Sequence, residues 1–283
     1  MRIDHRQTIE AALGRLSGIR PLSGGCVAEV YAARAADHPV VIKVDSGPTP
    51  ALDIEAFMLQ YLATESELPV PAVLHSEPSI LVMDYIENDG RGGRRGEEEA
   101  ADALAALHGI KAPRFGLHRD TLIGSLPQPN PQITSWPRFF AEARLLPMTR
   151  RCIDAGRLDK KTGRRLERLA QDLDDHLPHS VTPALLHGDV WSGNVLFHQG
   201  RLAALIDPAI YHGDPEVELA FITLFHTFGD PFFDRYAHHR TIAPEFFDHR
   251  RHVYNLYPLL VHVCLFGDSY IAQVQRALHR IGV

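Results

Sequence analysis

Three polar residues at a fixed spacing, set between short apolar runs, most constrain what this chain can fold into. Asp189 and Asn194 lie on either side of a short glycine-containing loop, and Asp207 follows a further apolar run. Two short strands joined by the turn at Gln199-Gly200 would bring the three polar side chains together. A cluster of two acids and one amide is what a phosphoryl-transfer centre requires.

The three side chains suit different parts of that chemistry. An alcohol that attacks the terminal phosphate of ATP needs a carboxylate to orient it and accept its proton, and we assign this role to Asp189. Asn194 and Asp207 offer oxygen ligands, which Mg²⁺ prefers. Each fragment alone also fits an ordinary turn or a strand end. Their combination in this order favours catalysis with ATP and Mg²⁺ as cofactors.

Composition excludes several classes of partner. The 283 residues are 45% hydrophobic and 23% charged, as in an ordinary globular protein with room for two lobes. The formal charge of −6 gives no support for binding nucleic acid or an anionic membrane surface. No apolar run reaches the ~18 residues of a membrane span, and the first residues lack a signal-peptide core. We expect a cytoplasmic monomer or weak homodimer.

The three cysteines are odd in number and far apart. Cys26, Cys152 and Cys264 do not form the spacing of a disulfide framework or of a thiolate zinc site. We therefore expect three reduced thiols.

A glycine-rich segment near the N-terminus is a candidate phosphate-binding loop. Ser23-Gly24-Gly25-Cys26 lies between two strand-like runs, which predicts the tip of a hairpin. Glycines there let backbone N–H groups approach an anion closely. Many hairpins carry such residues, so the segment alone is weak support for a nucleotide site.

A lysine in the next strand strengthens the interpretation. Lys43 lies within a Val/Ile-rich strand, where it is either an edge residue or the partner of a buried acid. Residues 51–63 follow with a helical apolar period that contains Glu55. A Lys43–Glu55 pair would direct the ammonium at the phosphates of a nucleotide.

A later apolar strand leads out of this lobe. We expect its end, Met83-Asp84-Tyr85-Ile86, to form the hinge between the two lobes and to bind adenine. The Asp84 carbonyl and the Ile86 amide are the expected backbone contacts.

These elements predict an α+β fold of the protein-kinase-like, two-lobe kind. Residues 1–86 would form a small antiparallel β-sheet lobe with a helix that clamps the nucleotide. Residues 87–283 would form a larger, mainly helical lobe for catalysis and acceptor binding.

The sequence around these residues resembles the fructosamine kinase (ketosamine 3-kinase) family, within the broader aminoglycoside-phosphotransferase and protein-kinase-like group. The resemblance runs from about Ser17 to Ala277 and is carried by several segments: 186–194, 207–209, 115–117, 123–125, 127–130, 257–262 and 265–270. The Trp191-Ser192-Gly193 part of the loop is its most distinctive feature.

This resemblance implies ATP-dependent phosphorylation of the 3-hydroxyl of free or protein-bound ketosamines, a deglycation reaction. It implies that Asp189 is catalytic, that Asn194 and Asp207 bind Mg²⁺, and that Lys43 paired with Glu55 binds phosphate. Asp207 is followed by proline, and no activation-loop signature follows. Both features favour a small-molecule kinase over a protein kinase.

Further residues are expected to hold the acceptor or the loop. We place the acceptor near Trp136, Trp191 and Tyr270, although packing is an equal alternative for Trp191. Glu218 stands where the family usually has Asp, and we expect it, with His187, to support the catalytic loop. Two alternatives remain open: a kinase of an aminoglycoside, choline or another small alcohol, and a non-catalytic nucleotide-binding protein of the same fold.

Overall fold

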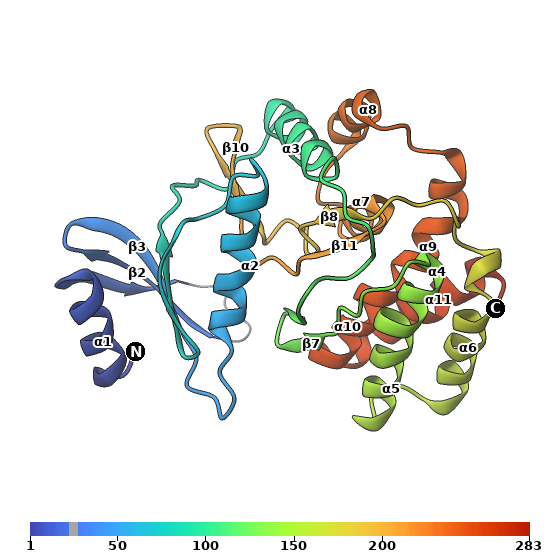
Figure 1. Ribbon diagram of the computed structural model, residues 1–283, viewed down its shortest axis with the longest axis horizontal. Helices are drawn as coiled ribbons and strands as arrows, with labels where there is room; N and C mark the ends of the chain where they lie inside the picture. The colour runs from blue at the N-terminus through green and yellow to red at the C-terminus, as the bar shows by residue number, and fades with distance from the viewer. Residues whose placement is uncertain (23–27) are drawn as a thin grey trace. The chain divides into compact units, whose positions relative to one another are not determined.

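The computed structural model describes residues 1–22 and 28–283, and the chain divides into two compact units (Figure 1). Unit 1 comprises residues 1–106 and 193–208, and unit 2 comprises residues 107–192 and 209–283. Among the described residues, no helix is both long and apolar enough to cross a membrane.

Unit 1 contains a five-stranded antiparallel sheet in the order β1-β2-β3-β5-β4. Its elements are α1 (Ile3–Leu13), β1 (Leu16–Pro21), β2 (Glu29–Ala35), β3 (His38–Val44), α2 (Leu52–Glu65), β4 (Val73–Glu77), β5 (Ile80–Asp84), α3 (Arg94–Leu107), β9 (Val195–His198) and β10 (Arg201–Leu205). The last residue of α3 falls in unit 2.

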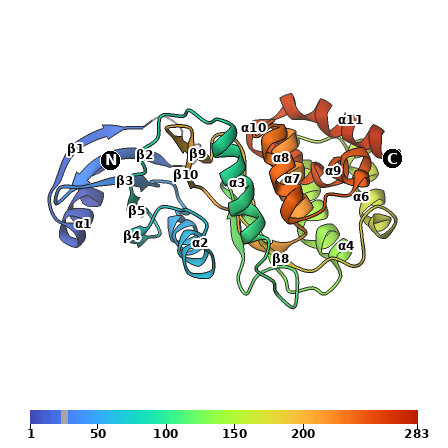
Figure 2. The same ribbon diagram turned by 90° about the horizontal axis from the view of Figure 1, so that it is seen from above.

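Alternating residues of β3 and β5 face two different helices. Val40, Ile42 and Val44 pack in one apolar cluster with Ile9 of α1. Residues of the opposite parity, such as Leu81, pack with α2 in a second cluster. Figure 2 shows α1 and α2 on opposite sides of β4 and β5. Because side chains alternate along a strand, this parity places Lys43 on the α2 face.

The β9–β10 hairpin belongs to unit 1 although it lies late in the sequence. Its turn residues Gln199 and Gly200 have positive φ angles of 50° and 75°, as tight hairpin turns require. Glu99 of α3 accepts hydrogen bonds from Arg201 (2.9 Å) and from the Leu202 amide (3.1 Å). Unit 1 therefore extends past the expected lobe boundary at residue 86, because α3 and the hairpin pack with each other.

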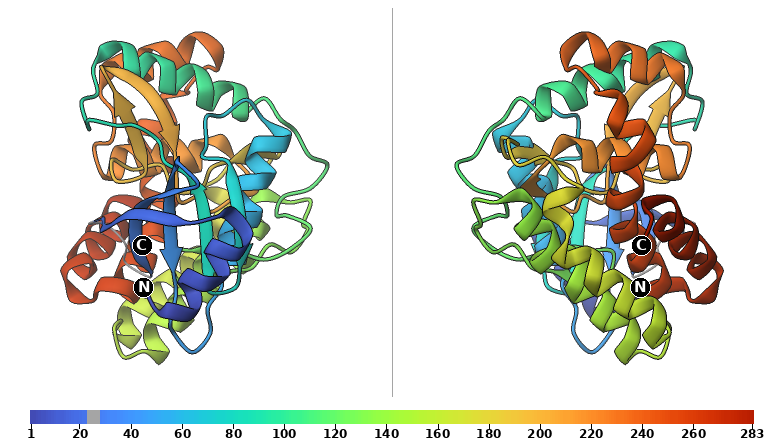
Figure 3. Two further views of the ribbon diagram at one scale, coloured as in Figure 1. Left: turned by 90° about the vertical axis from the view of Figure 1, so that its left-hand side faces the viewer. Right: turned by 90° about the vertical axis from the view of Figure 1, so that its right-hand side faces the viewer.

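Unit 2 is mainly helical. Its elements are β6 (Thr121–Ile123), β7 (Leu126–Gln128), α4 (Trp136–Phe139), η1 (Phe140–Leu145), α5 (Leu146–Asp154), α6 (Lys160–Gln171), η2 (Leu173–Asp175), β8 (Ala184–Leu186), β11 (Tyr211–Gly213), α7 (Pro215–Leu224), α8 (Asp230–His239), η3 (Phe246–Arg250), α9 (Arg251–Tyr254), α10 (Leu256–Phe266), η4 (Asp268–Tyr270) and α11 (Ile271–Ile281). Figure 3 shows the green α5 and α6 and the red α10 and α11 packed as a group. Together with the sheet of unit 1, this composition confirms the α+β class.

An aromatic cluster forms the core of unit 2. Trp136 is 0% exposed, and its ring lies 5.0–6.1 Å from those of Phe115, Phe139, Phe140 and Tyr254. Its indole N–H donates to the Tyr254 hydroxyl at 3.1 Å. This position corrects the expectation that Trp136 contacts an acceptor, because the side chain has no surface to offer to a substrate.

Two of the three cysteines are joined. Cys152 of α5 and Cys264 of α10 form a disulfide, with their Cα atoms 5.3 Å apart. The expectation of three reduced thiols is therefore wrong for this pair. The two cysteines are 112 positions apart in the sequence, which gave no hint of the bond, because the packing of α5 on α10 brings them together.

A buried acid begins α7. Asp214 accepts hydrogen bonds from the Glu216 amide at 3.0 Å and from the Tyr254 hydroxyl at 2.6 Å. Burial, with a smaller contribution from the Glu216 carboxylate, raises the pKa of Asp214 from 3.8 to about 6. A raised acid pKa means that the folded state binds the proton more tightly than the unfolded state. The protonated form therefore stabilises the fold at low pH, and this contribution is lost as the pH rises from about 4 through about 6.

We expect Asp214→Asn to remove this pH dependence while keeping an acceptor for the Glu216 amide. Between pH 5 and pH 7.5 the wild type should lose about 1 kcal/mol of unfolding free energy relative to the variant. Urea unfolding of both proteins at the two pH values measures the difference. A difference that does not change with pH would contradict the buried, proton-binding role of Asp214.

Candidate active site

A buried ammonium group organises the strand-rich unit. Lys43 is 8% exposed, and its Nζ donates to Glu55 Oε1 at 2.7 Å and to Asp207 Oδ1 at 2.5 Å. Burial on its own lowers the pKa of Lys43, but the Glu55 and Asp207 carboxylates outweigh burial and raise it. The lysine therefore stays charged. The pairing with Glu55 that the sequence indicated is present.

The β9–β10 hairpin brings the two expected metal ligands together. Asn194 directly precedes β9 and Asp207 follows β10, and the Ile206 amide donates to the Asn194 carbonyl at 3.0 Å. Asp207 has a φ of 54°, in the left-handed region that few residues other than glycine, asparagine and aspartate adopt. Its backbone conformation turns the chain directly after the hairpin.

The donor set at this position fits a magnesium ion. Asn194 and Asp207 supply an amide and a carboxylate oxygen, and hard cations such as Mg²⁺ take oxygen ligands. Within residues 1–22 and 28–283, no group of three or more His, Cys, Asp or Glu side chains is arranged to hold a metal. Phosphate and water oxygens would therefore have to complete a six-ligand shell, as is usual where Mg²⁺ accompanies a nucleotide.

The expected catalytic aspartate lies in unit 2, on a loop after β8 with a constrained backbone. Gly188 precedes Asp189 and has a φ of 87°. A Cβ at Gly188 would lie 2.1 Å from the Ala209 carbonyl oxygen, so only glycine fits there. The Asp189 amide donates to His187 Nδ1 at 3.3 Å, and the His187 carbonyl accepts from the Ala209 amide at 2.7 Å.

Glu218 of α7 accepts hydrogen bonds from this loop. Its Oε1 accepts from the Gly188 amide at 2.6 Å, and its Oε2 accepts from the His187 amide at 3.4 Å. We expected Glu218 to support the loop that carries Asp189, and these two hydrogen bonds are what such a role requires. They tie the backbone next to Asp189 to a helix that is buried in unit 2.

Two residues behind Glu218 were missed by the sequence analysis. Fully buried His108 contacts Glu218 Oε2 through Nε2 at 2.9 Å and the Tyr236 hydroxyl through Nδ1 at 2.7 Å. Because a carboxylate only accepts, Nε2 carries the hydrogen, and the neutral ring then accepts from Tyr236. Burial raises the pKa of Glu218 on its own, but the hydrogen bonds that the carboxylate accepts, that from His108 first, lower it overall. No sequence pattern links a helix-end histidine to a tyrosine 128 residues later.

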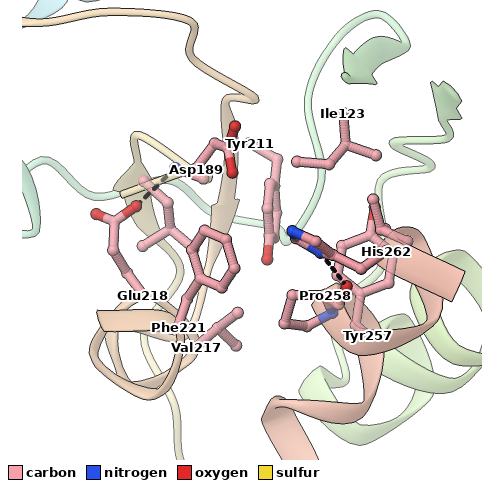
Figure 4. Close-up of a pocket in the computed structure, with 12 residues that line it drawn as sticks. Ile123, Asp189, Tyr211, Val217, Glu218, Phe221, Tyr257, Pro258 and His262 are labelled. Atoms are coloured by element: carbon pink, nitrogen blue, oxygen red, sulfur yellow. Dashed lines mark hydrogen bonds between the residues drawn. The ribbon is translucent and has the colours of Figure 1, made fainter. Parts of the chain in front are cut away.

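A pocket opens beside Asp189 within unit 2 (Figure 4). Its cavity volume is about 30 Å³, and most of its lining side chains are apolar or aromatic: Ile123, Leu186, Gly188, Asp189, Tyr211, Val217, Glu218, Phe221, Tyr257, Pro258, Val261 and His262. The sequence indicated Asp189 and Glu218 but not the pocket wall, which comes from five separate elements and the catalytic loop.

A buried arginine supports the tyrosine wall of this pocket. Arg144 donates to the carbonyls of Pro129 (2.6 Å) and Ala143 (3.0 Å) and to Asn130 Oδ1 (2.7 Å). Its guanidinium carbon lies 3.9 Å from the centre of the Tyr211 ring. The charge is thereby compensated by three oxygens and an aromatic face.

The other two expected acceptor residues lie among aromatic rings that continue from the pocket. Trp191 is 39% exposed, and its ring lies 6.3 Å from that of Phe225. The Tyr270 ring lies 4.9 Å from His262, and Phe225 lies at the same distance from His262. Both residues can therefore border an acceptor that extends out of the pocket.

The expected adenine hinge, residues 83–86, comprises the last two residues of β5 and the two that follow. The Asp84 amide donates to the Ala72 carbonyl at 3.0 Å, and the Tyr85 amide donates to the Pro39 carbonyl at 3.1 Å. Met83 is buried, and Ile86 is the next residue after this paired backbone. The expected phosphate loop, Ser23-Gly24-Gly25-Cys26, lies outside the described residues.

A family model and related sequences assign this chain to the same family. Residues 3–282 match the family model described as fructosamine kinase. A "probable ketoamine kinase" of Synechocystis is 35% identical over 93% of this chain and 90% of its own length. The chloroplastic protein-ribulosamine 3-kinase of Oryza sativa is 31% identical over 92% of this chain and 78% of its own length.

Solved structures agree with this result. A "putative fructosamine-3-kinase" from Thermobifida fusca has a TM-score of 0.88 and 31% identity, and covers 98% of this chain and 97% of its own. An ADP-bound aminoglycoside phosphotransferase has a TM-score of 0.68 and 15% identity over 99% of this chain and 98% of its own, so it shares the fold. The protein-kinase-like fold class is confirmed. The chain belongs to the fructosamine kinase family, which comprises ATP-dependent phosphotransferases.

Proposed function

We propose that this protein transfers the terminal phosphate of ATP to the 3-hydroxyl of ketosamines. The observation that carries the kinase assignment is the buried Lys43 ammonium, bonded at once to Glu55 and Asp207. Such a cation, held next to an acid suited to magnesium, is a preorganised binding site for phosphate groups. Family membership supports the ketosamine as the acceptor.

In this mechanism Lys43 binds the phosphates of ATP, and the Asp84 carbonyl and the Ile86 amide at the end of β5 bind adenine. Asp189 accepts a hydrogen bond from the acceptor hydroxyl and takes its proton as the oxygen attacks phosphorus, while ADP leaves with the bridging oxygen. Magnesium held by Asn194 and Asp207 would neutralise charge on the phosphates. Glu218 holds the Gly188 amide and so fixes the backbone that carries Asp189.

The pocket argues against a polycationic acceptor. An aminoglycoside would need several carboxylates, whereas the described lining supplies only those of Asp189 and Glu218. Glu218 already accepts from His108 and from two loop amides. A compact sugar with one amine fits this charge better than an aminoglycoside.

Exchanging the two acids separately tests their roles. Asp189→Asn should lower kcat for a ketosamine by at least ~100-fold, because the hydroxyl loses its proton acceptor, and should leave magnesium-dependent ATP binding nearly unchanged. Asp207→Asn should weaken that binding itself, because a metal ligand and the partner of Lys43 are changed. Calorimetric titration with ATP and single-turnover kinetics measure the two effects. Asp174→Asn, on an exposed acid, is the matched control; the reverse pattern would exchange the two assignments.

A screen of acceptors tests the substrate class. ATP consumption should rise with fructosyl-, ribulosyl- or erythrulosyl-lysine and stay at background with kanamycin and choline. Mass spectrometry of the product should show one added phosphate on the sugar. Turnover of kanamycin or choline alone would overturn the ketosamine assignment and leave the kinase assignment standing.

A further inference from the structure

His262 presents an unused hydrogen-bond acceptor to the pocket beside Asp189. It lies on α10, and its Nδ1 is 2.8 Å from the Pro258 carbonyl oxygen. A carbonyl oxygen can only accept, so Nδ1 carries the hydrogen. In the neutral ring, Nε2 is then an acceptor with a lone pair. No described residue of the chain donates to it.

The orientation of the ring directs this lone pair into the pocket. Figure 4 shows Nδ1 turned to Pro258 and the second ring nitrogen of His262 turned toward Tyr211, across the space that Asp189 also borders. Burial lowers the pKa of His262, and the Pro258 carbonyl only partly offsets this effect. The imidazole is therefore neutral at pH 7.

The surroundings suit a cationic donor. The described residues that line the pocket include the carboxylates of Asp189 and Glu218 and no lysine or arginine. The His262 ring lies 4.9 Å from the rings of Phe225 and Tyr270, and these contacts help to hold the imidazole at the edge of the pocket. A group that carries both positive charge and N–H donors is thus complementary to this part of the pocket.

We propose that His262 Nε2 accepts a hydrogen bond from the secondary ammonium of the ketosamine, and so distinguishes ketosamines from free ketoses. The inference rests on the proposed function. With the 3-hydroxyl bound at Asp189, the ammonium on carbon 1 is only two carbons further along the sugar. His262 and Asp189 line the same pocket and can engage the two groups of one substrate.

The test compares fructosyl-lysine with fructose, which is the same ketose without the amine. His262→Phe keeps an aromatic ring in the cluster and removes the acceptor. It should lower kcat/KM for fructosyl-lysine by roughly 10- to 100-fold, chiefly through KM, as expected for loss of a hydrogen bond to a charged donor. In this variant, kcat/KM for fructose and the KM for ATP should stay within about twofold of the wild-type values. Where fructose turnover is too slow, its Ki as a competitive inhibitor gives the comparison.

Two further variants separate recognition from packing. His262→Gln supplies a side-chain carbonyl acceptor and should restore part of the selectivity for fructosyl-lysine. His179→Phe, on an exposed histidine, should behave as the wild type. Equal losses for fructosyl-lysine and fructose, or no loss in His262→Phe, would overturn the proposal. A wild type that turns over no ketosamine would instead refute the proposed function on which it rests.

Discussion

The fold of unit 1 depends on the pairing of the buried Lys43 ammonium with two carboxylates. Removing a charge from water costs several kcal/mol unless it is paired and hydrogen-bonded. Glu55 of α2 and Asp207 after β10 supply the two partners, so a strand, a helix and a distant hairpin meet at one atom. Loss of either acid would leave the buried Lys43 ammonium with only one carboxylate partner. The polar groups that we propose to bind phosphate therefore also stabilise the fold of unit 1.

A comparable arrangement fixes the catalytic loop. Glu218 accepts from two loop amides and from His108, which in turn accepts from Tyr236. The carboxylate of a glutamate reaches one methylene further than that of the aspartate that the sequence resemblance led us to expect here. The histidine behind it gives this longer side chain a second fixed contact. Positioning of Asp189 is thus achieved by buried hydrogen bonds, which keep the loop backbone in place.

The parts of the site that the sequence predicted are those set by local periodicity. The alternation of β3 put Lys43 opposite the apolar face of α2, and the hairpin turn put Asn194 close to Asp207. Contacts set by packing could not be predicted in this way. His108, Tyr236 and His262 look like ordinary helix residues until the helices of unit 2 pack together. The packing of the helices likewise buries Trp136 in the core and brings Cys152 next to Cys264.

The pocket, its histidine and the proposed catalytic aspartate all belong to unit 2, whereas the lysine proposed to bind phosphate and the proposed metal ligands belong to unit 1. The residues that we propose for acceptor recognition and those that we propose for phosphate and metal binding therefore belong to separate compact units of one chain. Substitutions on α7 and α10 can remodel the pocket without disturbing the bonds around Lys43. Such a division lets one phosphoryl-transfer apparatus be reused for new alcohols during evolution, through changes confined to a few helix faces.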